Sequence, residues 1–106
     1  MNLLEFFGIL MDNAIEAANE CKEKKINVIM RTDINANRQL LIIENTYNNK
    51  DVDTDKIYEK GFSTKKNNTG LGLWEVRQIL KRNTNLNLFT HKNNEFFIQQ
   101  LEIYTN

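Results

Sequence analysis

The first apolar pattern of the chain constrains its fold most, because so much apolar surface has to be buried. Between Asn2 and about Lys24 apolar side chains recur at steps of three and four, the period of an amphipathic helix. They are Leu3, Phe7, Leu10, Ala14, Ala17 and Cys21, and Phe6, Ile9 and Met11 widen the stripe. The sequence therefore predicts a long and well-buried helix over this stretch.

Two strand-like segments follow this helix. Residues 26–32 and 39–45 are rich in β-branched and aliphatic side chains, and a polar turn at 33–37 joins them. The pattern predicts an antiparallel hairpin. Residues 46–69 are then dominated by Asn, Asp, Lys and Thr. A polar stretch of this length inside a compact domain is typical of a lid or binding loop.

Regular structure is expected again within and after this polar stretch. A short helix is predicted near 54–59, with Asp53 or Thr54 as its cap. A second amphipathic helix is predicted from Gly70 to about Arg82. Two closing strands are predicted near 86–90 and 96–104. The order helix–strand–strand–loop–helix–strand–strand predicts an α+β fold, a two-layer α/β sandwich in which helices cover one face of a mixed sheet.

Length and charge limit the possible classes of protein. The 106 residues indicate one domain, 1–106, and the formal net charge of +0 points to neither a nucleic acid nor an anionic membrane surface as a partner. No run reaches the about 18 apolar residues that a membrane span needs, so this domain is expected to be cytoplasmic. Its single cysteine, Cys21, cannot form an internal disulfide and is expected to be a thiol on the helix surface.

Two features point to chemistry, and each has an ordinary structural alternative. Asn13 stands in an otherwise apolar helix, either as a hydrogen-bonded core group or as an oxygen ligand for a cation such as Mg²⁺. Gly70 and Gly72 stand where a loop becomes a helix, either as part of a turn and cap or as a close approach of backbone N–H groups to phosphate. Their occurrence together, with a polar lid between them, favours the functional interpretation.

Three segments carry a family resemblance: LMDNAIEAA at 10–18, LIIENTY at 41–47 and KGFSTKKNNTGLGLWEV at 60–76. Together they resemble the ATP-binding domain of the GHKL superfamily, which gyrase, MutL and histidine kinases share. The greatest similarity is to the Agr-type sensor kinases, which detect peptide pheromones in Gram-positive bacteria. The resemblance implies a Bergerat-type ATP-binding fold, with ATP and Mg²⁺ as cofactors and quorum sensing as the biological context.

The resemblance also implies roles for individual residues. Asn13 matches the asparagine that ligates Mg²⁺ on the ATP phosphates. Asn45 falls where the superfamily usually has an aspartate that accepts a hydrogen bond from adenine, and the usual D-x-G-x-G is missing after it. The remaining ATP-binding residues that the resemblance implies belong to the lid and the glycine-rich segment: Phe62, Lys65, Thr69, Gly70, Leu71, Gly72 and Leu73.

One departure from the superfamily bears on the reaction. Hydrolytic members carry a glutamate four residues before the asparagine, and this chain has Ile9 there, which cannot activate water. The only histidine, His91, lacks the sequence surroundings of a phosphoacceptor and is expected to be structural or exposed. The phosphoacceptor is therefore expected elsewhere, on a helical dimerisation domain of the same receptor.

The implied function is the catalytic domain of a two-component sensor histidine kinase, cut from a longer membrane receptor. It would transfer the ATP γ-phosphoryl group to the partner histidine, and a response regulator would act downstream. Two alternatives stay open. One is a stand-alone GHKL nucleotide-binding regulator or anti-sigma-like serine kinase, and the other is a degenerate interaction module without enzymatic activity.

Overall fold

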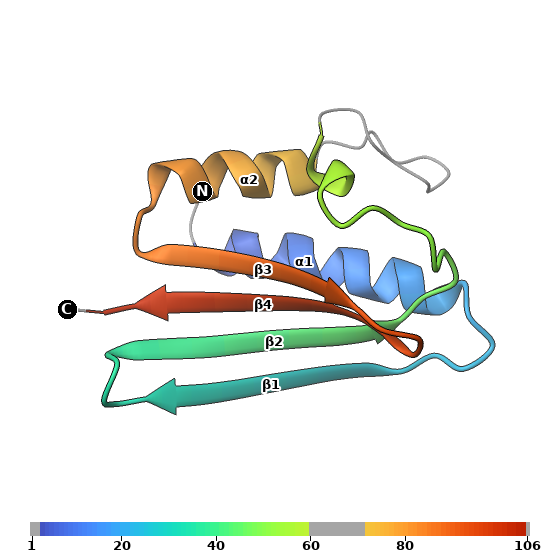
Figure 1. Ribbon diagram of the computed structural model, residues 1–106, viewed down its shortest axis with the longest axis horizontal. Coiled ribbons are helices and arrows are strands. Elements are labelled where there is room, and N and C mark those ends of the chain that lie inside the picture. Colours follow the sequence, from blue (N-terminus) through green and yellow to red (C-terminus); the bar gives the residue numbers. More distant parts are fainter. Residues whose placement is uncertain (1–2, 60–71, 106) are drawn as a thin grey trace.

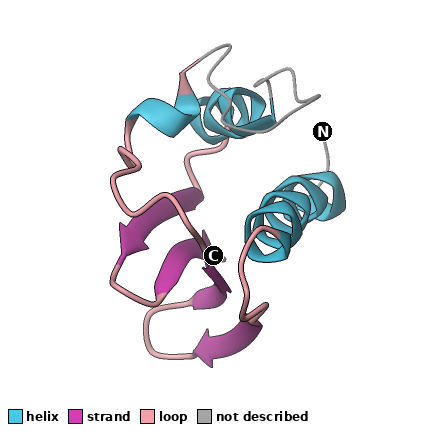
Figure 2. Ribbon diagram, turned by 90° about the vertical axis from the view of Figure 1, so that its right-hand side faces the viewer, coloured by secondary structure: helices cyan, strands magenta, loops and turns pink. Residues whose placement is uncertain are grey.

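The computed structural model describes residues 3–59 and 72–105. Within them the elements follow one another as α1 (Leu3–Asn19), β1 (Ile26–Asp33), β2 (Arg38–Thr46), the 3₁₀ helix η1 (Lys56–Tyr58), α2 (Gly72–Arg82), β3 (Leu86–Lys92) and β4 (Phe96–Tyr104). Both α-helices lie on one face of a single sheet (Figure 1), and the view along the strands in Figure 2 shows the two layers. The predicted α+β sandwich and its element order are confirmed.

The sheet is antiparallel throughout its described strands, so the prediction of a mixed sheet is wrong. The strand order is β1-β2-β4-β3, and each neighbouring pair runs antiparallel. The connection from β2 through α2 does make β3 parallel to β2, as the mixed sheet required. β4 lies between these two strands, however, and therefore no two neighbours run in the same direction.

The core lies between α1 and the two central strands. Phe6, Leu10, Ala14 and Ala18 recur every fourth residue on α1 and are buried. They face alternate residues of β2, of which Leu41 and Ile43 are buried, and Leu101 of β4 lies directly opposite Leu41. Val76 and Ile79 of α2 and Ile57 and Tyr58 of η1 complete the buried cluster.

The first helix ends at Asn19, five residues before the predicted end at Lys24. The backbone N–H groups of Glu20 and Cys21 donate to carbonyls three residues earlier, which tightens the last turn. The Lys24 ammonium then donates to the carbonyls of Asn19 and Cys21 at 2.9 and 2.6 Å. Lysine thus caps the helix end rather than extending the helix. Cys21 is buried and not a surface thiol, because this turn folds it under the helix.

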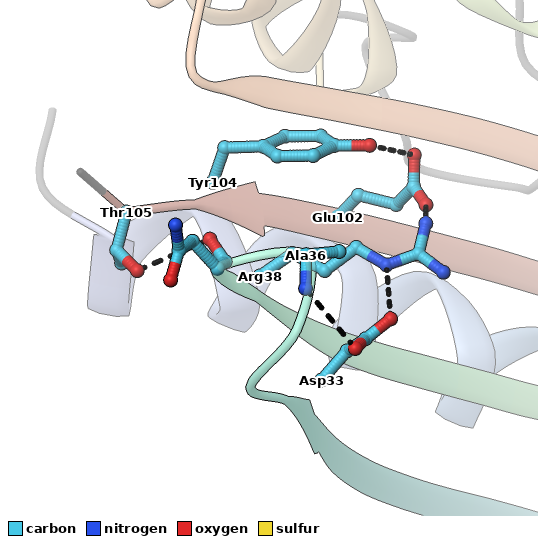
Figure 3. Close-up of polar contacts among 7 residues, drawn as sticks. Asp33, Ala36, Arg38, Glu102, Tyr104 and Thr105 are labelled. Atoms are coloured by element: carbon cyan, nitrogen blue, oxygen red, sulfur yellow. Dashed lines mark hydrogen bonds and ion pairs between the residues drawn. The ribbon is translucent and has the colours of Figure 1, made fainter.

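A polar network on the open face of the sheet joins the β1–β2 turn to the end of β4 (Figure 3). The Arg38 guanidinium donates from Nη1 to Glu102 and from Nε to Asp33, the latter at 3.3 Å. Tyr104 Oη donates to the other Glu102 oxygen at 3.4 Å. Thr105 donates its backbone N–H to the Asn37 carbonyl at 2.7 Å. The β1–β2 turn is therefore fastened to the last described residues of the chain.

Three side chains of β3 and β4 fasten the segment after β2 to that half of the sheet: Thr90, Lys92 and Gln99. Tyr58 of η1 donates its hydroxyl to Gln99 Oε1 at 3.0 Å and also contacts the Thr90 hydroxyl, which itself lies 2.7 Å from the same Gln99 oxygen. The Lys92 ammonium donates to the carbonyls of Lys50 and Val52, both at 2.8 Å. The start of the long polar stretch is thus held by β3 and β4.

The short helix predicted near 54–59 is present as η1, a single 3₁₀ turn with Asp55 as its N-cap residue. The side chain that bonds the start of this helix is that of Asp53, whose Oδ1 accepts hydrogen bonds from the backbone N–H groups of Asp55 and Lys56. These two bonds favour the ionised carboxylate and lower the pKa of Asp53. The predicted short helix is therefore present but shorter, and its N-cap residue is Asp55 rather than the predicted Asp53 or Thr54, although Asp53 accepts the two backbone bonds.

Asn37 closes the β1–β2 turn with a φ of 51°, the left-handed region, in which a side chain other than glycine or asparagine is strained. We expect Asn37→Gly to keep the stability of the wild type and Asn37→Ala to lose about 1 kcal/mol of unfolding free energy. Urea denaturation measures both. Asn35→Ala, an exposed change in the same turn, is the control, and equal losses for the two alanine variants would contradict the conformational argument.

Burial raises the pKa of Tyr58 above its ordinary value of 10.0. The proton is therefore held more tightly in the folded state, and this contribution to stability is full below pH 10 and is lost as the pH rises through the folded-state pKa. We expect Tyr58→Phe to cost about 1 kcal/mol at pH 7, from the lost hydrogen bonds. The gap to the wild type should narrow above pH 10, and a gap independent of pH in denaturant titrations would refute this.

Candidate functional site

Asn13 lies on the flank of α1, between the buried stripe and solvent. It is half-buried, and its amide nitrogen donates to the Ile9 carbonyl one turn earlier at 2.9 Å. This bond turns the nitrogen back onto the helix. The side chain is thereby fixed, while its neighbour Asp12 is exposed. The oxygen of a fixed amide is a suitable ligand for a hard cation.

The same flank of α1 meets the beginning of α2. A Cβ placed on Gly72 would lie 3.5 Å from Ile9 Cγ2 and 3.9 Å from the Asn13 amide nitrogen. The structure therefore brings together Asn13 and Gly72, which the sequence separates by the whole β-hairpin and lid. It also places Ile9 beside them, where hydrolytic members of the superfamily were expected to carry a glutamate.

The arrangement combines two groups with complementary chemistry. The first N–H groups of a helix have no partner within the helix and carry a partial positive charge, so they attract phosphate. Glycine at this place leaves room for an anion to approach the backbone. An amide oxygen next to that helix start is able to ligate the cation that accompanies a polyphosphate. Phosphate and a divalent cation fit this corner of the molecule.

Asn45 lies on the side of β2 that α1 covers, two residues beyond the buried Ile43. It is only 2% exposed, and its amide nitrogen donates to the Thr46 carbonyl at 3.0 Å. An asparagine in this state offers its carbonyl oxygen as an acceptor. Among the described residues, no hydrogen bond joins Asn45 to Asn13, so the two stand as separate parts of the candidate site.

The other expected site residues divide into two groups. Leu73 is half-buried and packs against the hydrophobic core, so its contribution is to hold the start of α2 in place. The rest lie outside the described residues: Phe62, Lys65, Thr69, Gly70 and Leu71. His91 lies in β3, opposite Ile98 of β4, and is exposed, one of the two states expected of it.

Sequence reasoning missed the polar anchors that lead into the site. Gln99, Thr90 and Lys92 received no role, yet they hold η1 and the segment before it against the sheet. Alternation along β4 contained a signal for one of them. Gln99 lies between Phe97 and Leu101 on the helix-facing side, and a polar residue there is buried and requires a partner.

Two further observations concern only the part of the chain that the structure describes. No three or more His, Cys, Asp or Glu side chains gather there in a group able to hold a metal ion. Neither α1 nor α2 is long and apolar enough to cross a membrane.

Comparison with solved structures places the fold. A nucleotide-free form of the catalytic domain of histidine kinase ThkA is 24% identical, with a TM-score of 0.74 over 94% of this chain and 64% of that one. A second nucleotide-free form is 22% identical, with a TM-score of 0.70 and the same coverage. The mycobacterial sensor histidine kinase MprB is 15% identical, with a TM-score of 0.70 over 93% and 67%. The chain thus spans about two thirds of these structures.

No curated protein matches the chain. A family model described as a GHKL domain, in contrast, matches residues 1–104. This match agrees with the fold that the chain shares with the solved structures. Because the match spans nearly the whole sequence, the chain belongs to the GHKL domain family.

Proposed function

We propose that this domain binds Mg·ATP and transfers the γ-phosphoryl group to a histidine on a separate helical dimerisation domain, as the catalytic part of a sensor histidine kinase. One observation carries the proposal: the fixed amide of Asn13 lies against the start of α2 at Gly72. Family membership makes a nucleotide the natural ligand for that corner, and ThkA and MprB are histidine kinases of the same fold.

Each described residue of the site has a distinct proposed role. Asn13 supplies an amide oxygen to Mg²⁺, and Gly72 lets the backbone N–H groups at the start of α2 approach the phosphates. Asn45, buried on β2, accepts a hydrogen bond from the adenine amino group. Phe62, Lys65, Thr69, Gly70 and Leu71 would complete the site. Mg²⁺ when bound neutralises charge on the phosphates, and phosphoryl transfer needs little more than that and positioning.

The side chain beside Asn13 supports transfer over hydrolysis. Ile9 places a methyl group next to Gly72, at the position where a carboxylate would orient an attacking water. Without a general base the domain holds ATP for an outside nucleophile. The partner is then a helical domain that carries the phosphoacceptor histidine, since His91 is exposed on a strand and is assigned no catalytic role.

The wider assignment follows from the same proposal. Residues 1–106 form one catalytic and ATP-binding domain of a longer receptor of the Agr type, which responds to a peptide pheromone in quorum sensing. The domain acts in the cytoplasm, on the inner side of the cell membrane, and a response regulator receives the phosphoryl group. The support is the sequence resemblance in the three segments that contain Asn13, Asn45 and Gly72.

The role of Asn13 is tested by Asn13→Ala. Losing the amide should weaken Mg·ATP binding about tenfold or more, because an oxygen ligand at the metal is gone. Isothermal titration with Mg·ATP measures the affinity, and the thermal unfolding midpoint reports the fold. Asn19→Ala, at an exposed asparagine of the same helix, is the matched control. Equal affinities for the two variants would remove Asn13 from the site.

Gly72→Ala separates ligand binding from folding. The added Cβ makes ordinary contacts of 3.5 and 3.9 Å, so the fold accommodates alanine without a clash. We therefore expect unchanged thermal stability together with weaker Mg·ATP binding, because the methyl group fills the space at the phosphates. Normal nucleotide affinity in this variant would show that Gly72 only begins the helix.

The proposal predicts that the domain does not hydrolyse ATP by itself but transfers the γ-phosphoryl group to a partner histidine. The 106-residue chain alone should show negligible steady-state ATPase activity, since lost general-base assistance typically costs about 10²–10⁴-fold. Mixed with a dimeric helical domain that carries a histidine, it should label that histidine from γ-³²P ATP. Robust hydrolysis by the chain alone would contradict the proposal. Absence of any Mg·ATP binding would identify a non-enzymatic interaction module instead.

A further inference from the structure

A pocket lies at the edge of the sheet, away from Asn13. It has a volume of about 490 Å³, within the range of known ligand pockets. α2, β3 and η1 contribute its lining residues, which are Tyr58, Arg77, Leu80, Lys81, Leu86, Asn87 and Leu88. Leu80, Leu86 and Leu88 are only half-buried and give it an apolar floor.

The pocket lies against β3, the edge strand of the sheet, where three successive residues, Leu86, Asn87 and Leu88, line it. Leu86 and Leu88 lie on the helix-facing side, because Leu88 is opposite the buried Leu101 of β4. β3 is the last strand in the order β1-β2-β4-β3 and pairs only with β4 among the described residues. The outward backbone N–H of Leu86 already donates to the Asn83 carbonyl at 3.1 Å, and the outward backbone groups beyond it are a template for another strand.

The charged residues that line this pocket are both basic. Arg77 and Lys81 stand one turn apart on α2, and none of the lining residues is acidic. The Arg77 guanidinium lies over the Tyr58 ring, 4.7 Å from its centroid. Because the Tyr58 hydroxyl is tied to Gln99 and Thr90, this ring is a fixed platform for the cation. The outward backbone groups of β3 beyond the Leu86 N–H, an apolar floor and two cations thus occur side by side.

We propose that this edge binds an extended, acidic segment of another protein, which adds a strand to β3. The segment's backbone pairs with the outer row of β3, one apolar side chain enters the pocket above Leu86 and Leu88, and a neighbouring carboxylate meets Arg77 and Lys81. Strand addition between a sheet edge and a helix uses backbone bonds for affinity and the pocket for specificity. A second copy of this chain fits poorly, because its own Arg77 and Lys81 would face the same two cations.

The site is distinct from the nucleotide corner. That corner involves the first residue of α2, whereas Arg77 and Lys81 belong to its later turns. Binding at β3 and binding of Mg·ATP are therefore separable by mutation.

The test starts from a random heptapeptide phage library selected on the folded 106-residue chain. Selected peptides are synthesised, and their affinities are measured for the wild type, Lys81→Glu, Lys81→Gln and the control Lys22→Glu, which changes an exposed lysine beyond α1. We expect acidic peptides with an apolar neighbour, about tenfold or greater weakening by Lys81→Glu, and a smaller loss with Lys81→Gln. Lys22→Glu should bind as the wild type does.

Two further measurements distinguish the peptide-binding site at β3 from the nucleotide site. Amide resonances of residues 86–92 should shift in ¹H–¹⁵N spectra when the peptide is added, and Lys81→Glu should keep wild-type affinity for Mg·ATP. The proposal is overturned if no acidic peptides are selected, if they bind Lys81→Glu unchanged, or if the shifts fall on β1. It is also overturned if sedimentation shows that the edge of β3 is covered by a second copy of the chain.

Discussion

The burial of α1 on β2 is the contact on which the other parts of the domain depend. Phe6, Leu10 and Ala14 lie at 1–3% exposure, and Ile43 beneath them is fully buried. This packing sets how α1 is rotated about its own axis. With one side fixed against the sheet, Asn13 and Ile9 have to emerge on the flank toward α2. The chemistry of the candidate site is therefore positioned by apolar contacts that take no part in it.

Periodicity predicted the helices and strands of this chain because each repeats its pattern over several turns or pairs. It failed where non-local contacts decide the outcome. The end of α1 depends on the Lys24 ammonium, which reaches back to two carbonyls, and no propensity of residues 20–24 reveals this bond. The prediction of a mixed sheet failed for a similar reason. Local sequence says that β3 and β4 form a hairpin but not which of them pairs with β2.

The candidate site was predictable in part. Asn13 and Gly72 were recognised from their residue types and from the family resemblance, and in the structure a Cβ added to Gly72 would lie 3.9 Å from the Asn13 amide nitrogen. The resemblance also gave Asn45 a role, but its burial and its bond to Thr46 follow only from the fold. The anchoring of η1 by Tyr58, Gln99 and Thr90 joins three separate segments. Only the alternation along β4, which turns Gln99 inward, offered a sign of it in the sequence.

The place of β4 in the sheet has a consequence for how the chain acquires its structure. As the strand nearest the C-terminus, β4 leaves the ribosome after all the others, yet it pairs with both β2 and β3. Until it arrives, the α1–β1–β2 half has an unpaired β2 edge. During synthesis the nascent domain thus has two incomplete halves, which a single late segment must join. The cooperativity of the domain rests on the long-range pairing of β4 with β2, such as Arg38 opposite Tyr104, a topology that slows folding and prolongs exposure of a strand edge.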